Sequence, residues 1–307
     1  MTTRVRWAAG IPQTWTSGGI DRPRIRRFLE RADALGFESA WVVEQVLGAI
    51  PSLDAVELLA WAAAVTERIR LGTAVLLTPV RSPVHLAKSL ATVDQLSGGR
   101  LDVGVGMGGN TKTYSAYGIT PARRVARFNE GIQLMRALWT EPRVTFRGEF
   151  WQLEDAAMEP KPAQRPHPPL WLGAHHPDAL RRAVRWDMGF MGAGSASTAT
   201  FAREMGMLRG FLEEAGRDPA ALDVGKRVYV ALDHDRDRAG RRLAEYFGAF
   251  YGRAELAAEV SVWGSAEQVV AGLREVAAAG ARLLMLNPVF DELDQLEALA
   301  ADVIPGF

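Results

Sequence analysis

Residues 91–109, ATVDQLSGGRLDVGVGMGG, decide the fold of this chain. The apolar residues of its first part recur at helical spacing up to Gly98 and Gly99, which can adopt the positive φ that ends a helix. From Leu101 the period changes to two, which indicates a strand. One face of that strand carries large apolar side chains. The other carries Asp102, Gly104, Gly106 and Gly108.

The glycine face of this strand needs an explanation, since a strand buried on both sides normally carries large apolar residues on both. One interpretation is that a flat, bulky group lies against the bare backbone. The alternative is that glycine merely fits a crowded barrel interior. The first interpretation predicts a vacant slot beside the strand, whereas the second predicts packed protein there.

The segments around this strand repeat a strand–helix pattern. Strands are expected at residues 5–11, 39–46, 70–78 and from 101, and each is followed by a helix. The link after the fourth strand, residues 110–121, is longer than the others. Such alternation predicts parallel βαβ units. About eight units can be counted, so the prediction is an α/β protein with a (β/α)₈ TIM-barrel fold in a single domain, residues 1–307. The later strands are expected at residues 170–174, 188–193, 224–232 and 282–287.

Residues 140–169 interrupt this rhythm and are predicted to form an insertion. They hold a hairpin-like pair of segments around Gly148 and then a proline-rich run, MEPKPAQRPHPP. A flexible linker between two domains is the alternative. Because the strand–helix pattern resumes directly afterwards, a lid or ledge on the barrel is favoured.

The composition excludes several classes of protein. The chain has 307 residues, 36 of them basic and 36 acidic, and no cysteine. Balanced charge gives no support for a nucleic-acid or membrane-surface role, and without cysteine there are no disulfides or thiolate ligands. No apolar run reaches spanning length, and the N-terminus lacks the apolar core of a signal peptide. We expect a cytoplasmic protein that acts on a small molecule, with no nucleic-acid or membrane partner.

The active site of a (β/α)₈ barrel lies at the carboxyl ends of its strands. This rule selects Glu44 and Gln45 after the second strand and His175 after the fifth as catalytic candidates. His175 could donate a proton or contact a ligand phosphate, and a capping or surface role is the alternative for it and for His176. The two histidines are adjacent and have no further ligand close in sequence, so no metal site is predicted.

The loop after the sixth strand, GAGSAS at residues 192–197, is the best candidate for phosphate binding. Its glycines let amide N–H groups converge, its serines add hydroxyl donors, and a helix N-terminus follows. An ordinary helix cap with turn glycines is the alternative. Gly104, Gly106 and Gly109 formally satisfy G-x-G-x-x-G, but they lie in the fourth strand, so a Rossmann site is not predicted.

Two long segments carry a family resemblance. They are LAKSLATVDQLSGGRLDVGVGMGG at residues 86–109 and LMRALWTEPRVTFRGEFWQLEDAAMEPKPAQRPHPPLWLGA at residues 134–174. Both closely resemble the luciferase-like flavin-dependent oxidoreductases, and above all the branch that uses the deazaflavin F420. The resemblance implies a (β/α)₈ barrel with an insertion, a homodimer, and a flavin or deazaflavin held without a covalent bond in the barrel mouth.

The same resemblance implies where the cofactor lies. The ring would lie across strands two to four, against Gly106 and Gly108. A non-prolyl cis peptide at Ala74–Val75 would bulge beneath it. The residues that the resemblance assigns to the phosphate are Gly173, Ala174, Gly194 and Ser195.

Three positions depart from the pattern of F420-dependent relatives. Several members have Asp-His where this chain has Glu44-Gln45, and some sugar-phosphate-oxidising members have an acid where this chain has Gly109. Gln45 cannot act as a general base, although Glu44 could relay a proton. Reduction of an activated double bond, or monooxygenation, asks less of the protein because the cofactor carries the chemistry.

The leading prediction is therefore an F420-dependent oxidoreductase that moves a hydride to or from a small organic substrate. The closest alternative is an FMN-dependent monooxygenase that uses reduced flavin and oxygen. More distant alternatives are a non-catalytic flavin-binding protein and a metal-dependent barrel hydrolase, for which the sequence offers no ligand set.

Overall fold

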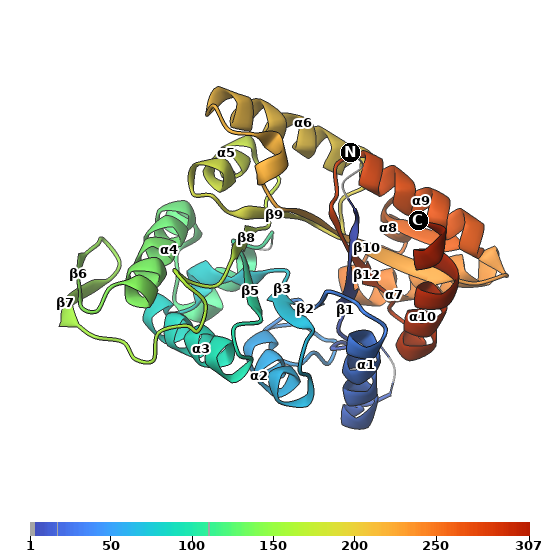
Figure 1. Cartoon of the computed structure of the whole chain (residues 1–307), viewed down its shortest axis with the longest axis horizontal. Helices are drawn as coiled ribbons and strands as arrows, with labels where there is room; N and C mark the ends of the chain where they lie inside the picture. The colour runs from blue at the N-terminus through green and yellow to red at the C-terminus, as the bar shows by residue number, and fades with distance from the viewer. Residues whose placement is uncertain (1–3, 17, 110) are drawn as a thin grey trace.

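The computed structural model describes residues 4–16, 18–109 and 111–307. Its centre is a closed barrel of parallel strands with helices packed outside it (Figure 1). Hydrogen bonding runs round the barrel in the order β10, β12, β1, β2, β3, β5, β8, β9 and back to β10, which confirms the (β/α)₈ prediction. The strands are β1 (Arg6–Gly10), β2 (Ser39–Val42), β3 (Arg70–Thr73), β5 (Leu101–Gly106), β8 (Leu170–Leu172), β9 (Gly189–Gly192), β10 (Val224–Leu232) and β12 (Leu283–Asn287).

Helices follow the strands and bury their apolar sides against the barrel. Short polar side chains cap several of them: the Ser197 hydroxyl, for example, accepts from the Thr200 amide at 3.2 Å, just before α6. The helices are α1 (Arg22–Ala34), α2 (Ala55–Val65), α3 (Pro83–Leu96), α4 (Arg124–Thr140), α5 (Pro177–Arg185), α6 (Thr198–Glu214), α7 (Arg236–Tyr251), α8 (Leu256–Val260), α9 (Ala266–Ala278) and α10 (Glu292–Ala298).

The insertion between α4 and β8 leaves the barrel, as the sequence predicts. Strands β6 (Val144–Arg147) and β7 (Gln152–Ala156) form an antiparallel hairpin at the edge of the molecule (Figure 1). The carboxylate of Glu130 on α4 accepts hydrogen bonds from the backbone amides of residues 149, 150 and 151. These three bonds fix the hairpin turn to the helix that precedes it.

Two features of the sheet differ from the sequence-based prediction. The third strand, expected to run without interruption over residues 70–78, breaks after Thr73 and resumes as β4 (Leu76–Leu77). A short strand, β11 (Ser261–Gly264), pairs with the second half of β10 outside the closed ring. Four residues are too few to show a hydrophobic period, so the pattern gave no sign of β11.

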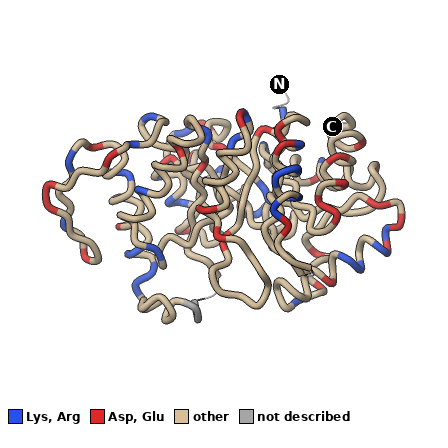
Figure 2. The backbone as a smooth tube through the Cα atoms, turned by 90° about the horizontal axis from the view of Figure 1, so that it is seen from below, with Lys and Arg blue, Asp and Glu red and all other residues tan. Residues whose placement is uncertain are grey.

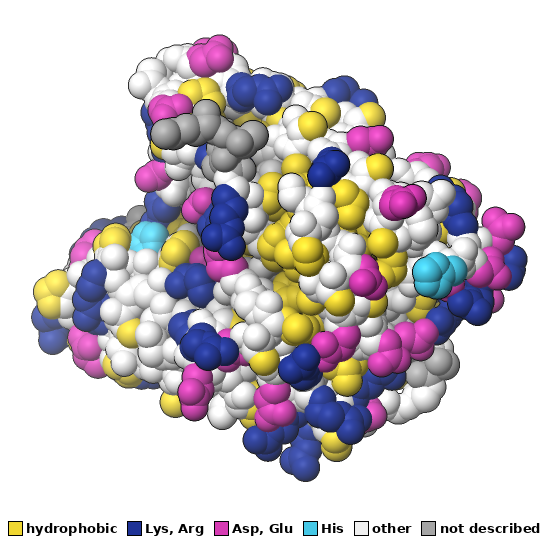
Figure 3. Space-filling view, turned by 45° about the vertical axis from the view of Figure 1, so that its right-hand side comes forward, with side chains coloured by type: hydrophobic (Ala, Val, Ile, Leu, Met, Phe, Trp, Pro, Cys, Tyr) yellow, Lys and Arg dark blue, Asp and Glu magenta, His cyan; other side chains and the backbone are white. Residues whose placement is uncertain are grey.

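Charged residues of both signs occur along much of the described backbone in the view of Figure 2. Basic and acidic residues are interspersed along the backbone, with no region reserved for one sign (Figure 2). On the face in Figure 3, hydrophobic side chains gather near the centre and charged side chains surround them. Among the described residues, no helix combines the length and the apolar character that crossing a membrane requires.

Candidate cofactor site

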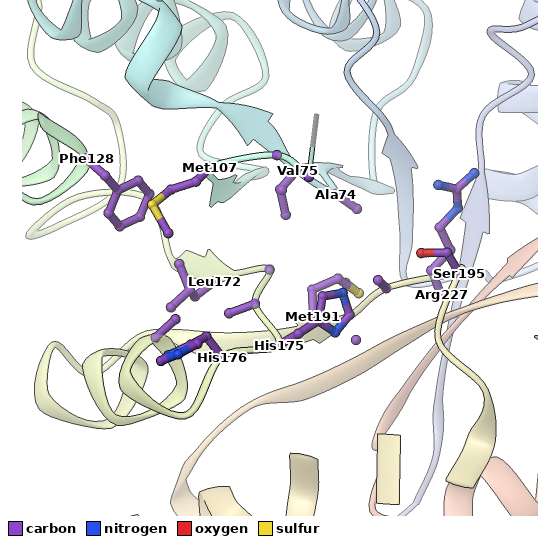
Figure 4. Close-up of a pocket in the computed structure, with 18 of the residues that line it drawn as sticks. Ala74, Val75, Met107, Phe128, Leu172, His175, His176, Met191, Ser195 and Arg227 are labelled. Carbon is purple, nitrogen blue, oxygen red and sulfur yellow. The ribbon is translucent and has the colours of Figure 1, made fainter. Parts of the chain in front are cut away.

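A cavity of about 370 Å³ opens at the carboxyl ends of the barrel strands. Its walls come from the segment between β3 and β4, the loop after β5, the ends of β8 and β9 with the loops that follow them, strand β10, helices α4 and α5, and the end of α7. In Figure 4, Ala74 and Val75 lie on one side of this cavity, and His175 and Leu172 lie on the other. This is the position in which barrels of this class place their active sites.

The segment between β3 and β4, residues 74–75, forms one wall of the cavity. Its Ala74–Val75 peptide bond is cis, which confirms the position that the family resemblance implies. Thr73 fixes this turn to β5 twice, because its hydroxyl donates to the Gly104 carbonyl and accepts from the Gly104 amide, both at 2.8 Å. Sequence reasoning did not single out Thr73, whose only signal was a polar residue in a buried strand.

The glycine face of β5 packs against this turn, and the interpretation that a ligand lies directly on that face is wrong. A Cβ at Gly104 would lie 1.8 Å from the Thr73 carbonyl oxygen, and one at Gly106 would lie 2.6 Å from Cγ2 of Val75. Gly106 faces protein rather than the cavity, whereas Gly108 lines the cavity. The crowded-interior alternative therefore holds for the strand itself, and the open space lies one layer further out, beyond Val75.

The residues assigned to the phosphate by resemblance, Gly173, Ala174, Gly194 and Ser195, all line the cavity. The Gly173 amide donates to the Val105 carbonyl at 3.0 Å, so its N–H is not available to a phosphate. A Cβ there would meet Val75 at 3.0 Å, which again shows that the turn needs glycine beside it. Ala174, Gly194 and Ser195 remain the residues whose backbone could serve a phosphate.

Lys226 holds the loop after β9 by hydrogen bonds to its backbone carbonyl groups. Its ammonium donates to the carbonyl oxygens of Ala193 at 2.5 Å and Ala196 at 2.9 Å, and also to that of Arg227 at 3.0 Å. Burial lowers the pKa of Lys226 to about 7, although the charge of Glu204 opposes this shift. Because the carbonyl groups of the loop are held inwards, the loop has a fixed shape where it borders the cavity. Sequence reasoning missed this residue, and its signal was a basic pair within an otherwise apolar strand.

His175 borders the cavity and its ring is held by Glu204. The Nδ1 atom of His175 lies 2.5 Å from Oε1 of Glu204, a buried residue of α6. This hydrogen bond raises the pKa of His175 above its ordinary value, whereas burial lowers it. The arrangement leaves Nε2 as the ring nitrogen that can hold or release a proton at the cavity. His176 also lines the cavity, and it caps α5, since its Nδ1 accepts from the Asp178 amide at 3.2 Å.

Glu44 and Gln45 are not among the residues that line the cavity. The Glu44 side chain is 1% exposed and is held by the Arg81 guanidinium and the Leu77 amide. Arg81 also binds Asp54 at 2.9 Å. Oε1 of Gln45 is buried without a hydrogen-bond partner. The structure thus places Glu44 where it supports β4, and the proton-relay role remains a prediction from sequence.

Known proteins share this fold and parts of this sequence. The family model described as luciferase-like monooxygenase matches residues 5–283. An uncharacterised protein of Mycobacterium tuberculosis is 48% identical over 113 residues, which are 37% of this chain and 40% of that protein. The F420-dependent glucose-6-phosphate dehydrogenase of Kineococcus radiotolerans is 31% identical over 70% of this chain and 66% of its own length. The chain therefore matches less than two thirds of the length of these curated relatives.

A solved structure resembles the whole chain. The monooxygenase RslO1 from Streptomyces bottropensis superimposes with a TM-score of 0.86 and 26% sequence identity, over 98% of this chain and 99% of that one. The shared fold therefore includes the insertion and the segments that form the cavity.

Proposed function

Because the chain belongs to the luciferase-like monooxygenase family, we propose that it is an oxidoreductase that transfers a hydride between coenzyme F420 and a small organic substrate. The observation that supports this most strongly is the cavity itself, which is bordered by the cis Ala74–Val75 turn and by the loops after β8 and β9. The likeness to an F420-dependent dehydrogenase over 70% of the chain supports the choice of cofactor.

The cavity suits a flat ring with an anionic tail. Val75, Leu172 and Met191 supply apolar walls, and the glycines that surround Val75 let the turn come close to the barrel axis. The loops at Ala174 and at residues 194–195 lie at the edge of the same space. When bound, the deazaflavin would supply or accept the hydride at its ring carbon.

The chain's own residues would orient the reactants, exclude water and handle a proton. Val75 would support one face of the ring, and the apolar walls would keep water from the reacting atoms. His175 would hold a proton at Nε2, because Glu204 occupies Nδ1. We also propose a homodimer that works in the cytoplasm on a small molecule, with residues 1–307 as a single domain; the family resemblance supports this assignment.

A second candidate function is an FMN-dependent monooxygenase on the same barrel. The likeness to the monooxygenase RslO1, at 26% identity over nearly the whole chain, supports it. The two functions share the cavity and differ in which reduced ring binds and whether oxygen takes part.

Anaerobic titration of the purified protein with reduced F420 and, separately, with reduced FMN distinguishes the two functions. We expect a dissociation constant for F420 in the micromolar range and at least tenfold weaker binding of FMN. Mixing the F420 complex with acceptors that carry activated C=C or C=N bonds should reoxidise the cofactor. Tight FMN binding with no affinity for F420 would reverse the order of the two proposals.

A further inference from the structure

One end of the cavity contains a buried cation. Arg227, on β10, lines the cavity and is only 8% exposed. Its Nε donates to Oδ1 of Asn287 at 2.6 Å, and its guanidinium lies 4.6 Å from the centre of the Tyr229 ring. Figure 4 shows Arg227 and Ser195 at the end of the cavity opposite to Phe128 and Met107. The guanidinium is therefore fixed in direction and shielded from bulk water.

Among the described residues, this cation has no carboxylate partner. Within residues 4–16, 18–109 and 111–307, no ion pair includes Arg227. An arginine side chain carries five N–H donors and stays charged at any pH at which proteins fold. A buried charge is costly unless a partner compensates it. We therefore expect a ligand in the cavity to supply the compensating negative charge.

A hydroxyl group accompanies this cation. Tyr251, at the end of α7, also lines the cavity, and its hydroxyl lies 2.8 Å from that of the fully buried Tyr229. When Tyr229 donates in this pair, the Tyr251 hydroxyl is free to donate to a ligand. Gly194 makes room for the arrangement, since a Cβ there would lie 2.9 Å from the Tyr229 ring and 3.1 Å from Cδ of Arg227.

We propose that the Arg227–Tyr251 end of the cavity binds a phosphate or carboxylate group of a ligand. A guanidinium presents paired N–H groups that match two oxygens of such a group, and the Tyr251 hydroxyl adds a third donor. Asn287 acts as a positioning residue that holds the guanidinium. The anion has two possible sources, the phosphate of the cofactor or an acidic group on the substrate, and this assignment rests on the proposed function.

The test compares two variants that each remove an arginine stacked on an aromatic ring. Arg227→Met removes the cation and keeps an apolar side chain of similar length. Arg236→Met is the matched control, since Arg236 lies 4.7 Å from the Trp263 ring and outside the cavity. Inorganic phosphate is titrated calorimetrically into each protein, alone and saturated with F420. We expect Arg227→Met to weaken phosphate binding at least tenfold and Arg236→Met to change it less than twofold.

Titrations with F420 and with its phosphate-free deazaflavin core identify the source of the anion. If Arg227→Met weakens F420 binding tenfold but leaves binding of the core unchanged, the anion at Arg227 belongs to the cofactor. If F420 binding is unchanged and phosphate binding to the F420-saturated protein is weakened, the acidic group belongs to the substrate. Tyr251→Phe removes one hydroxyl and should weaken phosphate binding about threefold. This variant replaces Arg227→Met in the test if Arg227→Met fails to fold.

The proposal is overturned if Arg227→Met and Arg236→Met bind phosphate and F420 alike, or if Tyr251→Phe binds phosphate as the wild type does. Should the wild type bind neither F420 nor FMN, the proposed function fails. The phosphate titrations of the cofactor-free protein then still decide whether Arg227 binds an anion.

Discussion

Gly106→Ala is expected to weaken F420 binding at least tenfold, and Val75→Ala in the same chain is expected to restore part of the loss. A Cβ at residue 106 would lie 2.6 Å from Cγ2 of Val75 and 3.3 Å from the Gly173 carbonyl oxygen. The added methyl must therefore push Val75 towards the cavity that it lines. Overpacking of this kind typically lowers the free energy of unfolding by about 1–3 kcal/mol. A displaced Val75 that costs the bound ring about 1.4 kcal/mol of binding free energy would lower the affinity tenfold. Fluorescence titration with F420 measures the change.

The second substitution makes this test specific. Val75→Ala removes the methyl group that a methyl side chain at position 106 would meet at 2.6 Å, so the double variant keeps only the 3.3 Å approach to the Gly173 carbonyl oxygen as a close contact. Gly206→Ala on α6 is the control, because a Cβ there meets nothing within 4 Å. It should leave F420 binding unchanged and raise the free energy of unfolding by about 0.5–1 kcal/mol, since alanine favours a helix over glycine. Wild-type affinity in Gly106→Ala would show that Val75 does not support the ring.

Glu44→Gln is expected to lower the free energy of unfolding by about 3 kcal/mol. The Glu44 carboxylate is almost fully buried and is held by Arg81 and by the Leu77 amide. Removing its charge leaves Arg81, which is 24% exposed, with Asp54 as its carboxylate partner. Loss of one member of a buried ion pair typically costs 3–5 kcal/mol. Urea denaturation followed by circular dichroism measures the change.

Glu38→Gln is the matched control for this prediction. Glu38 pairs with Arg6 at the surface, where the two side chains are 38% and 32% exposed, so its loss should cost less than about 1 kcal/mol. The outcome also tests the sequence-based role of Glu44. A Glu44→Gln variant that unfolds like the wild type but transfers no hydride would make Glu44 a proton relay rather than a support for β4.

The barrel was predictable from sequence because the apolar residues of each strand and each helix recur with the period of that element. Apolar residues alternate or recur at helical spacing over long windows, and short links leave few topologies. The break in the third strand was not visible in this way. Residues 70–78 form a largely apolar run, and only the family resemblance pointed to Ala74–Val75.

The glycines of β5 show why the site was harder to predict than the fold. Their spacing correctly indicated that something approaches the strand closely, but it could not distinguish a ligand from a neighbouring turn. The Thr73 carbonyl and the Val75 side chain fill that space, and they come from another strand. Lys226 and Glu204 were missed for a similar reason, since the role of each depends on a hydrogen-bond partner about 30 residues away in the sequence.

The proposed function requires a deazaflavin ring to lie against the Ala74–Val75 turn. A crystal structure of the protein with F420 tests it most directly. We expect the ring within van der Waals distance of Val75 and its phosphate beside the loops at Ala174 and Ser195. F420 bound elsewhere on the protein, with the cavity beyond Val75 empty or filled by side chains, would contradict this position of the ring.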